Sequence, residues 1–120
     1  MDCESSMTES FFTRKLLKAL RSHPALLDAV IWKHNDASTG GIPDFSVSWG
    51  RVTLWFEVKL GRNIPTKLQR WALGKLRDGG ILISVSRDGR DILIGPQGEL
   101  PRLLSFDELV EEIVRRCVNA

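Results

Sequence analysis

This chain has few cysteines and lacks any long apolar run. These two features argue against a disulfide-rich, zinc-binding or membrane-spanning protein. Two of the 120 residues are cysteines, Cys3 and Cys117, and they lie near opposite ends of the sequence. Their separation does not match the ligand spacing of a zinc site, and no cluster of Cys and His residues supplies one elsewhere. The simplest interpretation is two reduced thiols, which are typical of a cytoplasmic protein.

The sequence shows no segment suited to a membrane or to secretion. No apolar run approaches the roughly 20 residues that a membrane-spanning helix needs, and the first residues include Asp2 and Glu4 rather than the apolar core of a signal peptide. We also find no internal repeat, low-complexity tract or second domain. With 120 residues and 42% hydrophobic content, the chain is expected to form one domain, residues 1–120, around one core.

Hydrophobic periodicity and turn residues predict three helices and five strands. The expected helices cover residues 9–22, residues from 65 or 66 to the glycines at 79–80, and residues 105–119; the expected strands cover 30–34, 45–49, 52–59, 81–86 and 92–94. This order, α-β-β-β-α-β-β-α, predicts an α/β fold with a mixed β-sheet flanked by helices. The second helix would form the crossover between the third and fourth strands.

A predicted hairpin over residues 45–59 sets the positions of two acidic side chains. Gly50-Arg51 suits a two-residue type II′ turn. The register that follows places Asp44 opposite Glu57, with Cβ atoms roughly 5 Å apart on the same face. Lys59 shares this face because it lies two residues beyond Glu57. The other face is a candidate core, made of Phe45, Val47, Trp49, Val52, Leu54, Phe56 and Val58.

Two carboxylates as close as Asp44 and Glu57 repel, which raises the pKa of at least one of them unless a cation lies between them. Oxygen ligands favour Mg²⁺ or Mn²⁺ over zinc, and the main-chain carbonyl of Val58 is a candidate further ligand. Such an ion would lower the pKa of a bound water and stabilise charge on a phosphate. Lys59 would hold the attacking water or neutralise the developing charge. The pattern indicates a metal-dependent nuclease; the alternative is a surface hairpin whose charged side chains are merely solvated.

Two further polar residues lie on apolar helix stripes. Glu9 shares the stripe of the first expected helix, which includes Leu16 and Leu20, and Gln69 shares the stripe of the second, which includes Leu73. An acid in this position either caps the helix or serves a site. A buried Gln is costly unless it is hydrogen-bonded, so Gln69 is either a satisfied residue of the helix start or part of a site.

These residues resemble the PD-(D/E)xK nuclease superfamily, and most closely the stand-alone VRR-NUC domain of phages and bacteria. The shared pattern consists of Glu9 in a first helix, the run Gly41-Ile42-Pro43-Asp44, the run Glu57-Val58-Lys59, then Gln69, and Gly79-Gly80 before the next strand. The resemblance covers about residues 9–95, which is most of the chain.

The resemblance implies a Mg²⁺- or Mn²⁺-dependent DNA endonuclease with a restriction-endonuclease-like fold, acting in a bacterial or phage-infected cell. It implies metal binding by Asp44 and Glu57, catalysis by Lys59, and supporting roles in the site for Glu9 and Gln69. Small members of the family resemble Holliday-junction resolvases that act as homodimers. The implied substrate is therefore a four-way junction or related branched DNA.

Basic residues gather along the segment that contains the candidate site. Residues 51–77 include seven Lys and Arg residues and a single acid, Glu57, and such a surface attracts phosphate backbones. The candidate DNA contacts are Arg62, Lys67, Arg70, Lys33, Arg14 and Lys18. The alternative is an ordinary solvated surface. His34, which ends the first expected strand, is expected to be structural rather than catalytic.

One active site per chain cannot easily cut both strands of a junction symmetrically, so we expect a homodimer. Trp71 and the apolar face of the third helix are candidate interface elements, with internal packing as the alternative for both. Two other functions stay open: a non-catalytic DNA-binding module of the same fold, and a partner-binding regulatory protein with a basic surface. A nuclease would lose its activity in EDTA, whereas neither alternative would respond.

Overall fold

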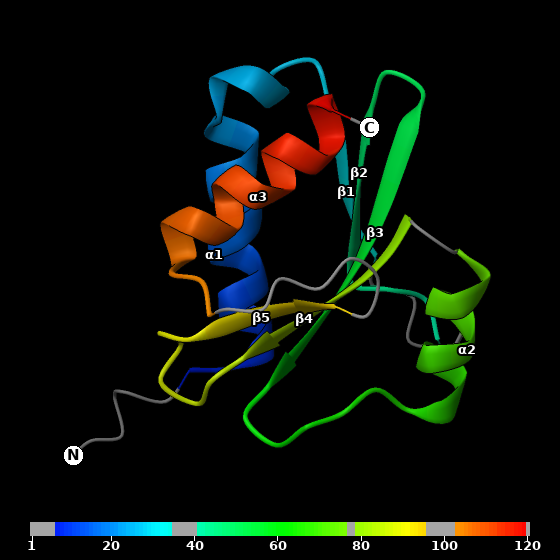
Figure 1. The fold of residues 1–120 in the computed structure, drawn as a ribbon, viewed down its shortest axis with the longest axis vertical. Helices are drawn as coiled ribbons and strands as arrows, with labels where there is room; N and C mark the ends of the chain where they lie inside the picture. Colours follow the sequence, from blue (N-terminus) through cyan, green and yellow to red (C-terminus); the bar gives the residue numbers. More distant parts are fainter. Residues whose placement is uncertain (1–6, 35–40, 77–78, 96–102, 120) are drawn as a thin grey trace.

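A computed structural model describes residues 7–34, 41–76, 79–95 and 103–119. Its elements are α1 (Glu9–Ser22), a short 3₁₀ helix η2 (Pro24–Leu26), β1 (Val30–Lys33), β2 (Phe45–Trp49), β3 (Val52–Leu60), α2 (Lys67–Lys75), β4 (Gly80–Val85), β5 (Ile92–Gly95) and α3 (Phe106–Val118). The strands form one five-stranded sheet in the order β1-β2-β3-β4-β5, in which only β3 and β4 are parallel. The expected α/β class with a mixed sheet flanked by helices is confirmed (Figure 1).

The first helix begins and ends where its sequence predicts. The Thr8 side chain accepts a hydrogen bond from the Phe11 N–H at 2.9 Å, which satisfies one of the free amides of the first turn. The chain leaves the helix at His23, directly before Pro24. The face that meets the sheet is fully buried and includes Phe12, Leu16, Leu17 and Leu20.

The β2–β3 hairpin has the predicted register. Trp49 pairs with Val52 and Phe45 pairs with Phe56, and Gly50 has the positive φ of 60° that such a tight turn requires. The two phenylalanine rings stack at 4.8 Å on the core face. The core between the sheet and helices α1 and α3 therefore forms on the predicted side of the hairpin.

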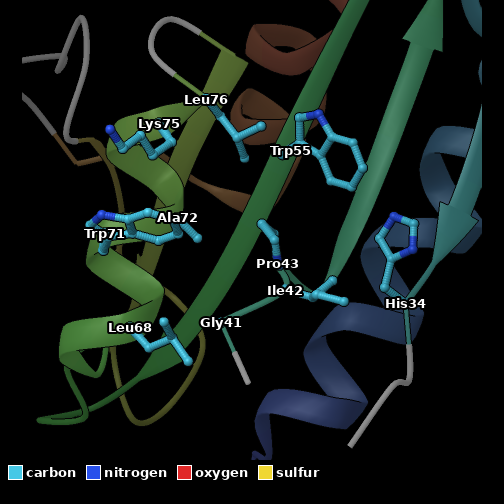
Figure 2. A pocket seen from close by; sticks show the side chains of 10 residues that line it. All are labelled: His34, Gly41, Ile42, Pro43, Trp55, Leu68, Trp71, Ala72, Lys75 and Leu76. Carbon is cyan, nitrogen blue, oxygen red and sulfur yellow. The ribbon is translucent and has the colours of Figure 1, made fainter. Parts of the chain in front are cut away.

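Helix α2 lies on the opposite side of the sheet from α1 and α3 (Figure 1). It connects the parallel strands β3 and β4 as a crossover and ends at Lys75, before the predicted glycines. Gly80 is needed at the start of β4 because a Cβ there would lie 2.4 Å from the Leu73 carbonyl oxygen. Gly41, with φ of 90°, also lies close to α2, since a Cβ there would lie 2.8 Å from Leu68 Cγ (Figure 2).

Helix α3 packs internally, so the structure does not support its apolar face as a dimer interface. The residues of this face are buried: Leu109, Val110, Ile113, Val114 and Cys117. The predicted capping box is present, because Ser105 Oγ accepts from the Glu108 N–H and Glu108 Oε1 accepts from the Ser105 N–H. Cys3 lies outside the described residues. None of the described helices has the length and apolar character needed to cross a membrane.

Candidate active site

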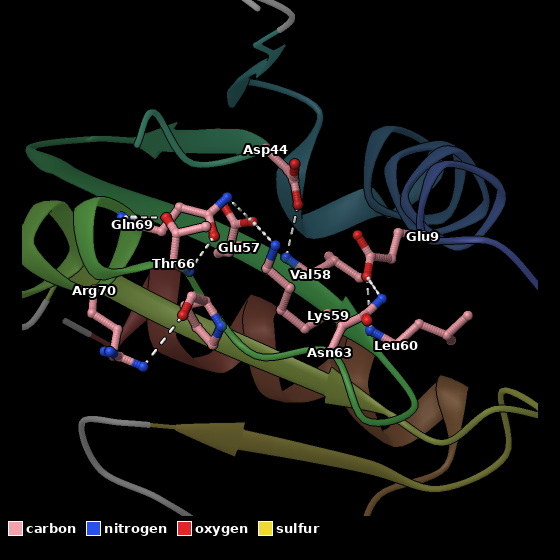
Figure 3. A network of polar contacts seen from close by, with 11 residues as sticks. Glu9, Asp44, Glu57, Val58, Lys59, Leu60, Asn63, Thr66, Gln69 and Arg70 are labelled. Atoms are coloured by element: carbon pink, nitrogen blue, oxygen red, sulfur yellow. Dashed lines mark hydrogen bonds and ion pairs between the residues drawn. The ribbon is translucent and has the colours of Figure 1, made fainter. Parts of the chain in front are cut away.

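Asp44 and Glu57 lie close together at the end of the β2–β3 hairpin that is opposite its turn. Asp44 directly precedes β2, and its Oδ2 accepts a hydrogen bond from the Val58 N–H of β3 at 2.8 Å (Figure 3). Glu57, the neighbour of Val58, is only 2% exposed. The hairpin register thus brings the two carboxylates to one place, as the sequence predicts.

Glu57 is held on one of its two oxygens. Oε2 accepts a hydrogen bond from Gln69 Nε2 at 3.0 Å and lies 3.3 Å from Lys59 Nζ. Oε1 is buried and has no hydrogen-bond partner among the described residues. A buried carboxylate oxygen without a partner is unfavourable, so this atom is a site at which a cation or a donor would be stabilised.

The electrostatics of the two carboxylates favour a cationic ligand. Burial, followed by the negative charge of Asp44, raises the pKa of Glu57 to about 7, although Lys59 opposes the shift. Burial also raises the pKa of Asp44, against the hydrogen bond from Val58 and the charge of Lys59. Glu9 adds to both shifts by repulsion. Since desolvation and like charge both disfavour the ionised pair, a bound cation would relieve the strain.

The donor set fits Mg²⁺ or Mn²⁺ with two protein carboxylates. Within the described ranges, no three His, Cys, Asp or Glu side chains are grouped closely enough to hold an ion by themselves. Mg²⁺ is commonly held by one or two carboxylates together with waters and substrate phosphates. Asp44, Glu57 through its free oxygen, and the Val58 carbonyl are the groups of this chain that would supply such a site.

Gln69 has both of the contacts that its position suggests. Its Oε1 accepts a hydrogen bond from the Thr66 N–H at 2.9 Å, and its own N–H donates to Thr66 Oγ1 at 3.1 Å, which completes a capping box. Its Nε2 reaches Glu57. The side-chain amide of Gln69 therefore completes the cap of α2 and also orients the buried carboxylate of Glu57.

Glu9 does not cap α1, because Thr8 does so. Its Oε2 instead accepts hydrogen bonds from the Leu60 N–H at 3.1 Å and from Asn63 Nδ2 at 2.8 Å (Figure 3). Glu9 thereby ties α1 to the end of β3 and to the loop beyond it. Nothing in the sequence distinguishes Asn63 from any other polar loop residue, so its contact with Glu9 is visible only in the structure.

The basic candidates fall into two groups. Arg62, Lys67 and Arg70 are exposed on the loop after Lys59 and on the first turn of α2. Lys33 lines a cavity of about 240 Å³ together with Glu9 and Asp44, and its charge lowers the pKa of Asp44. The remaining two, Arg14 and Lys18, are exposed on α1, and among the described residues neither is a hydrogen-bond or ion-pair partner of Asp44 or Glu57.

His34 has the structural contacts expected of it. Its Nε2 lies 2.9 Å from Ser46 Oγ, and its ring stacks on Trp55 with 5.1 Å between the centroids. Its main-chain N–H donates to the Asp44 carbonyl at 2.8 Å. These contacts hold β1 against the segment that carries Asp44.

Comparisons of the chain with protein-family models, with curated proteins and with solved structures find no match. The resemblance to the VRR-NUC domain therefore depends on the residues named above and on their arrangement.

Proposed function

We propose that this chain is a Mg²⁺- or Mn²⁺-dependent endodeoxyribonuclease of the VRR-NUC type, with a restriction-endonuclease-like fold, that cuts branched DNA in the cytoplasm. The observation that supports it most is the convergence of Asp44, Glu57 and Lys59, in which Glu57 keeps one buried oxygen free. A solvated surface hairpin would not desolvate its acidic side chains in this way.

Asp44, Glu57 and the Val58 carbonyl would hold the ion. The chemistry supplied by Mg²⁺ or Mn²⁺ when bound is a lower pKa of water and stabilisation of negative charge on phosphate. Gln69 fixes the rotamer of Glu57 by using one oxygen of its carboxylate, so that the other oxygen stays available. Such positioning by a packed neighbour is what a preorganised site requires.

Lys59 is the group of this chain best placed to act on a phosphate. Its side chain is only 13% exposed and its Nζ lies 3.3 Å from Glu57 Oε2. In this partly desolvated place an ammonium group interacts strongly with the negative charge that develops on a phosphate. We assign to it the orientation of the attacking water or the neutralisation of that charge.

Arg62, Lys67 and Arg70 are proposed to bind the phosphates that flank the cut. All three are exposed close to the loop that leaves β3 after Lys59, so they extend the site along a DNA backbone. Binding through such contacts falls steeply with salt concentration. A second copy of the chain would place an equivalent site on the opposed strand of a four-way junction.

Cleavage assays test the proposal directly. Labelled duplex, flap, splayed-arm and four-way-junction DNAs are incubated with the protein and Mn²⁺ or Mg²⁺, with EDTA as the metal-free arm. We expect cleavage of branched DNA that disappears in EDTA and in Asp44→Asn. Asp28→Asn, which changes an exposed aspartate in the turn after η2, is the matched control and should cut normally. Cleavage that persists in Asp44→Asn, or its absence on every substrate, contradicts the proposal.

A further inference from the structure

A groove of about 440 Å³ opens between α2 and the sheet (Figure 2). Leu68, Trp71 and Lys75 line it from α2, and His34 and Trp55 line it from the sheet. This volume lies within the range of roughly 300–1,000 Å³ that is typical of sites for small molecules. Two indole rings thus border one groove from opposite sides.

The apolar side chains of this groove are unusually exposed. Trp71 is 62% exposed and Leu68 is 49% exposed. Large apolar side chains grouped on a surface commonly mark a binding site. Gly41 allows the segment before β2 to approach Leu68 closely, because any side chain at position 41 would collide with Leu68.

The groove lies next to the candidate active site along both β3 and the segment before β2. Trp55 lies two residues before Glu57 on β3, so both side chains leave the same face of the sheet about 7 Å apart along the strand. On the other wall, Ile42 and Pro43 lead directly into Asp44. A group seated in the groove would therefore adjoin whatever is bound by the carboxylates.

The charge around the groove suits a nucleotide. Lys75 Nζ lies 5.6 Å from the centre of the Trp71 ring, and Lys67 and Arg70 are exposed on the same helix. Aromatic walls beside basic side chains are the arrangement by which proteins stack single-stranded bases while binding their phosphates. An apolar protein segment would use the indoles but would offer no negative charge to these basic side chains.

We propose that this groove binds one unpaired nucleobase of the DNA strand next to the scissile phosphate. A paired base is enclosed in its stack and reaches such a groove only after it is unpaired. The inference deepens the proposed nuclease function, on which it rests, by naming the substrate class: DNA with at least one unpaired base beside the cut, such as a flap or a splayed arm.

Base binding can be measured without cleavage. The probe is a duplex with a single-stranded flap that carries 2-aminopurine at the first unpaired positions, titrated with the full chain in EDTA. We expect quenching of the 2-aminopurine fluorescence on binding. Trp71→Ala should abolish the quenching and weaken flap binding about tenfold, with binding of the plain duplex changed less than about twofold. Trp71→Phe should restore both, because it keeps an aromatic face.

Trp32→Ala is the matched control. Trp32 is 65% exposed on β1 but does not line the groove, so its replacement should leave flap binding and quenching unchanged. Equal losses in Trp71→Ala and Trp32→Ala, or no quenching in the native chain, overturn the base site. So does a change of Trp71→Ala from dimer to monomer in sedimentation with unchanged flap binding, which would identify a second copy as the occupant.

The two proposals fail separately. Quenching that depends on Trp71, without cleavage in Mn²⁺, supports the base site and contradicts the nuclease. Cleavage that depends on Asp44, without quenching that depends on Trp71, supports the nuclease and overturns the base site.

Discussion

Gln69 donates a hydrogen bond to Glu57 across the gap between α2 and β3, with 3.0 Å between Nε2 and Oε2. The same side chain closes the capping box of α2 through Thr66. The start of the helix and the buried carboxylate are therefore positioned by one amide. A substitution at Gln69 should therefore alter both the stability of the start of α2 and the orientation of the Glu57 carboxylate.

Gln69→Leu should reduce both stability and cleavage. It removes the cap contact, at a cost of about 1 kcal/mol, and leaves Glu57 with one fewer donor, so the carboxylate loses its orientation. Thr66→Ala is the control, because it removes the capping hydroxyl but not the amide that meets Glu57. Urea denaturation should show comparable losses in both variants, whereas only Gln69→Leu should lower kcat. Equal losses of kcat would mean that Gln69 acts through the helix alone.

Lys59→Met should abolish most of the cleavage while DNA binding is retained. The ammonium group is proposed to act on charge that develops during the reaction, and removal of such a group costs about 10²–10³ in rate. The aliphatic part of the side chain is kept in Met. Kd for branched DNA from fluorescence anisotropy in EDTA should change by less than about threefold. A large loss of affinity with unchanged kcat would show that Lys59 binds the ground state instead.

Local patterns predicted much of this fold. The bounds of α1, the register of the β2–β3 hairpin and the Ser105–Glu108 capping box follow from residues close together in sequence. The meeting of Asp44 with the β3 strand follows from that register. These features depend on neighbours rather than on how the layers pack.

Features that depend on packing between distant elements could not be predicted. In the sequence, the apolar face of α3 is equally consistent with a core position and with an interface. Only the placement of the helix against the sheet shows that this face belongs to the core. The contact of Glu9 with Asn63 joins residues 54 positions apart. The groove beside Trp55 is lined by α2, by β3 and by residues 41–43, and no local pattern in the sequence shows that these segments lie together.

Stability should fall as the pH rises through the range set by Glu57. Its pKa is 4.5 in its ordinary state and about 7 in the folded chain, so between these values the folded state binds more protons than the unfolded state. The free energy of unfolding therefore decreases with rising pH in this window and levels off above about pH 7. The full effect is about 3 kcal/mol, and the raised pKa of Asp44 acts in the same direction.

The Glu57→Gln variant isolates this contribution. Its side chain does not titrate, so the difference in unfolding free energy between the variant and the native chain, measured by urea denaturation in EDTA, should grow from pH 4.5 to pH 7. Asp28→Asn, at an exposed aspartate in the turn after η2, serves as the control and should give a smaller, flatter difference. If the stability of the native chain instead rises from pH 4.5 to pH 7, ionising the Glu57 carboxylate in the folded state costs little free energy, and the prediction is wrong.

Mn²⁺ should stabilise the folded chain, and more strongly at pH 8 than at pH 6. The ion and the proton compete for Glu57, whose pKa of about 7 makes it largely protonated at the lower pH. A ligand at ten times its Kd stabilises the folded state by about 1.4 kcal/mol, which raises the Tm of a domain of this size by several degrees. Differential scanning calorimetry without DNA measures the shift independently of cleavage. Asp44→Asn should lose it, while Asp28→Asn should keep it; an equal shift in both would place the bound Mn²⁺ elsewhere on the chain.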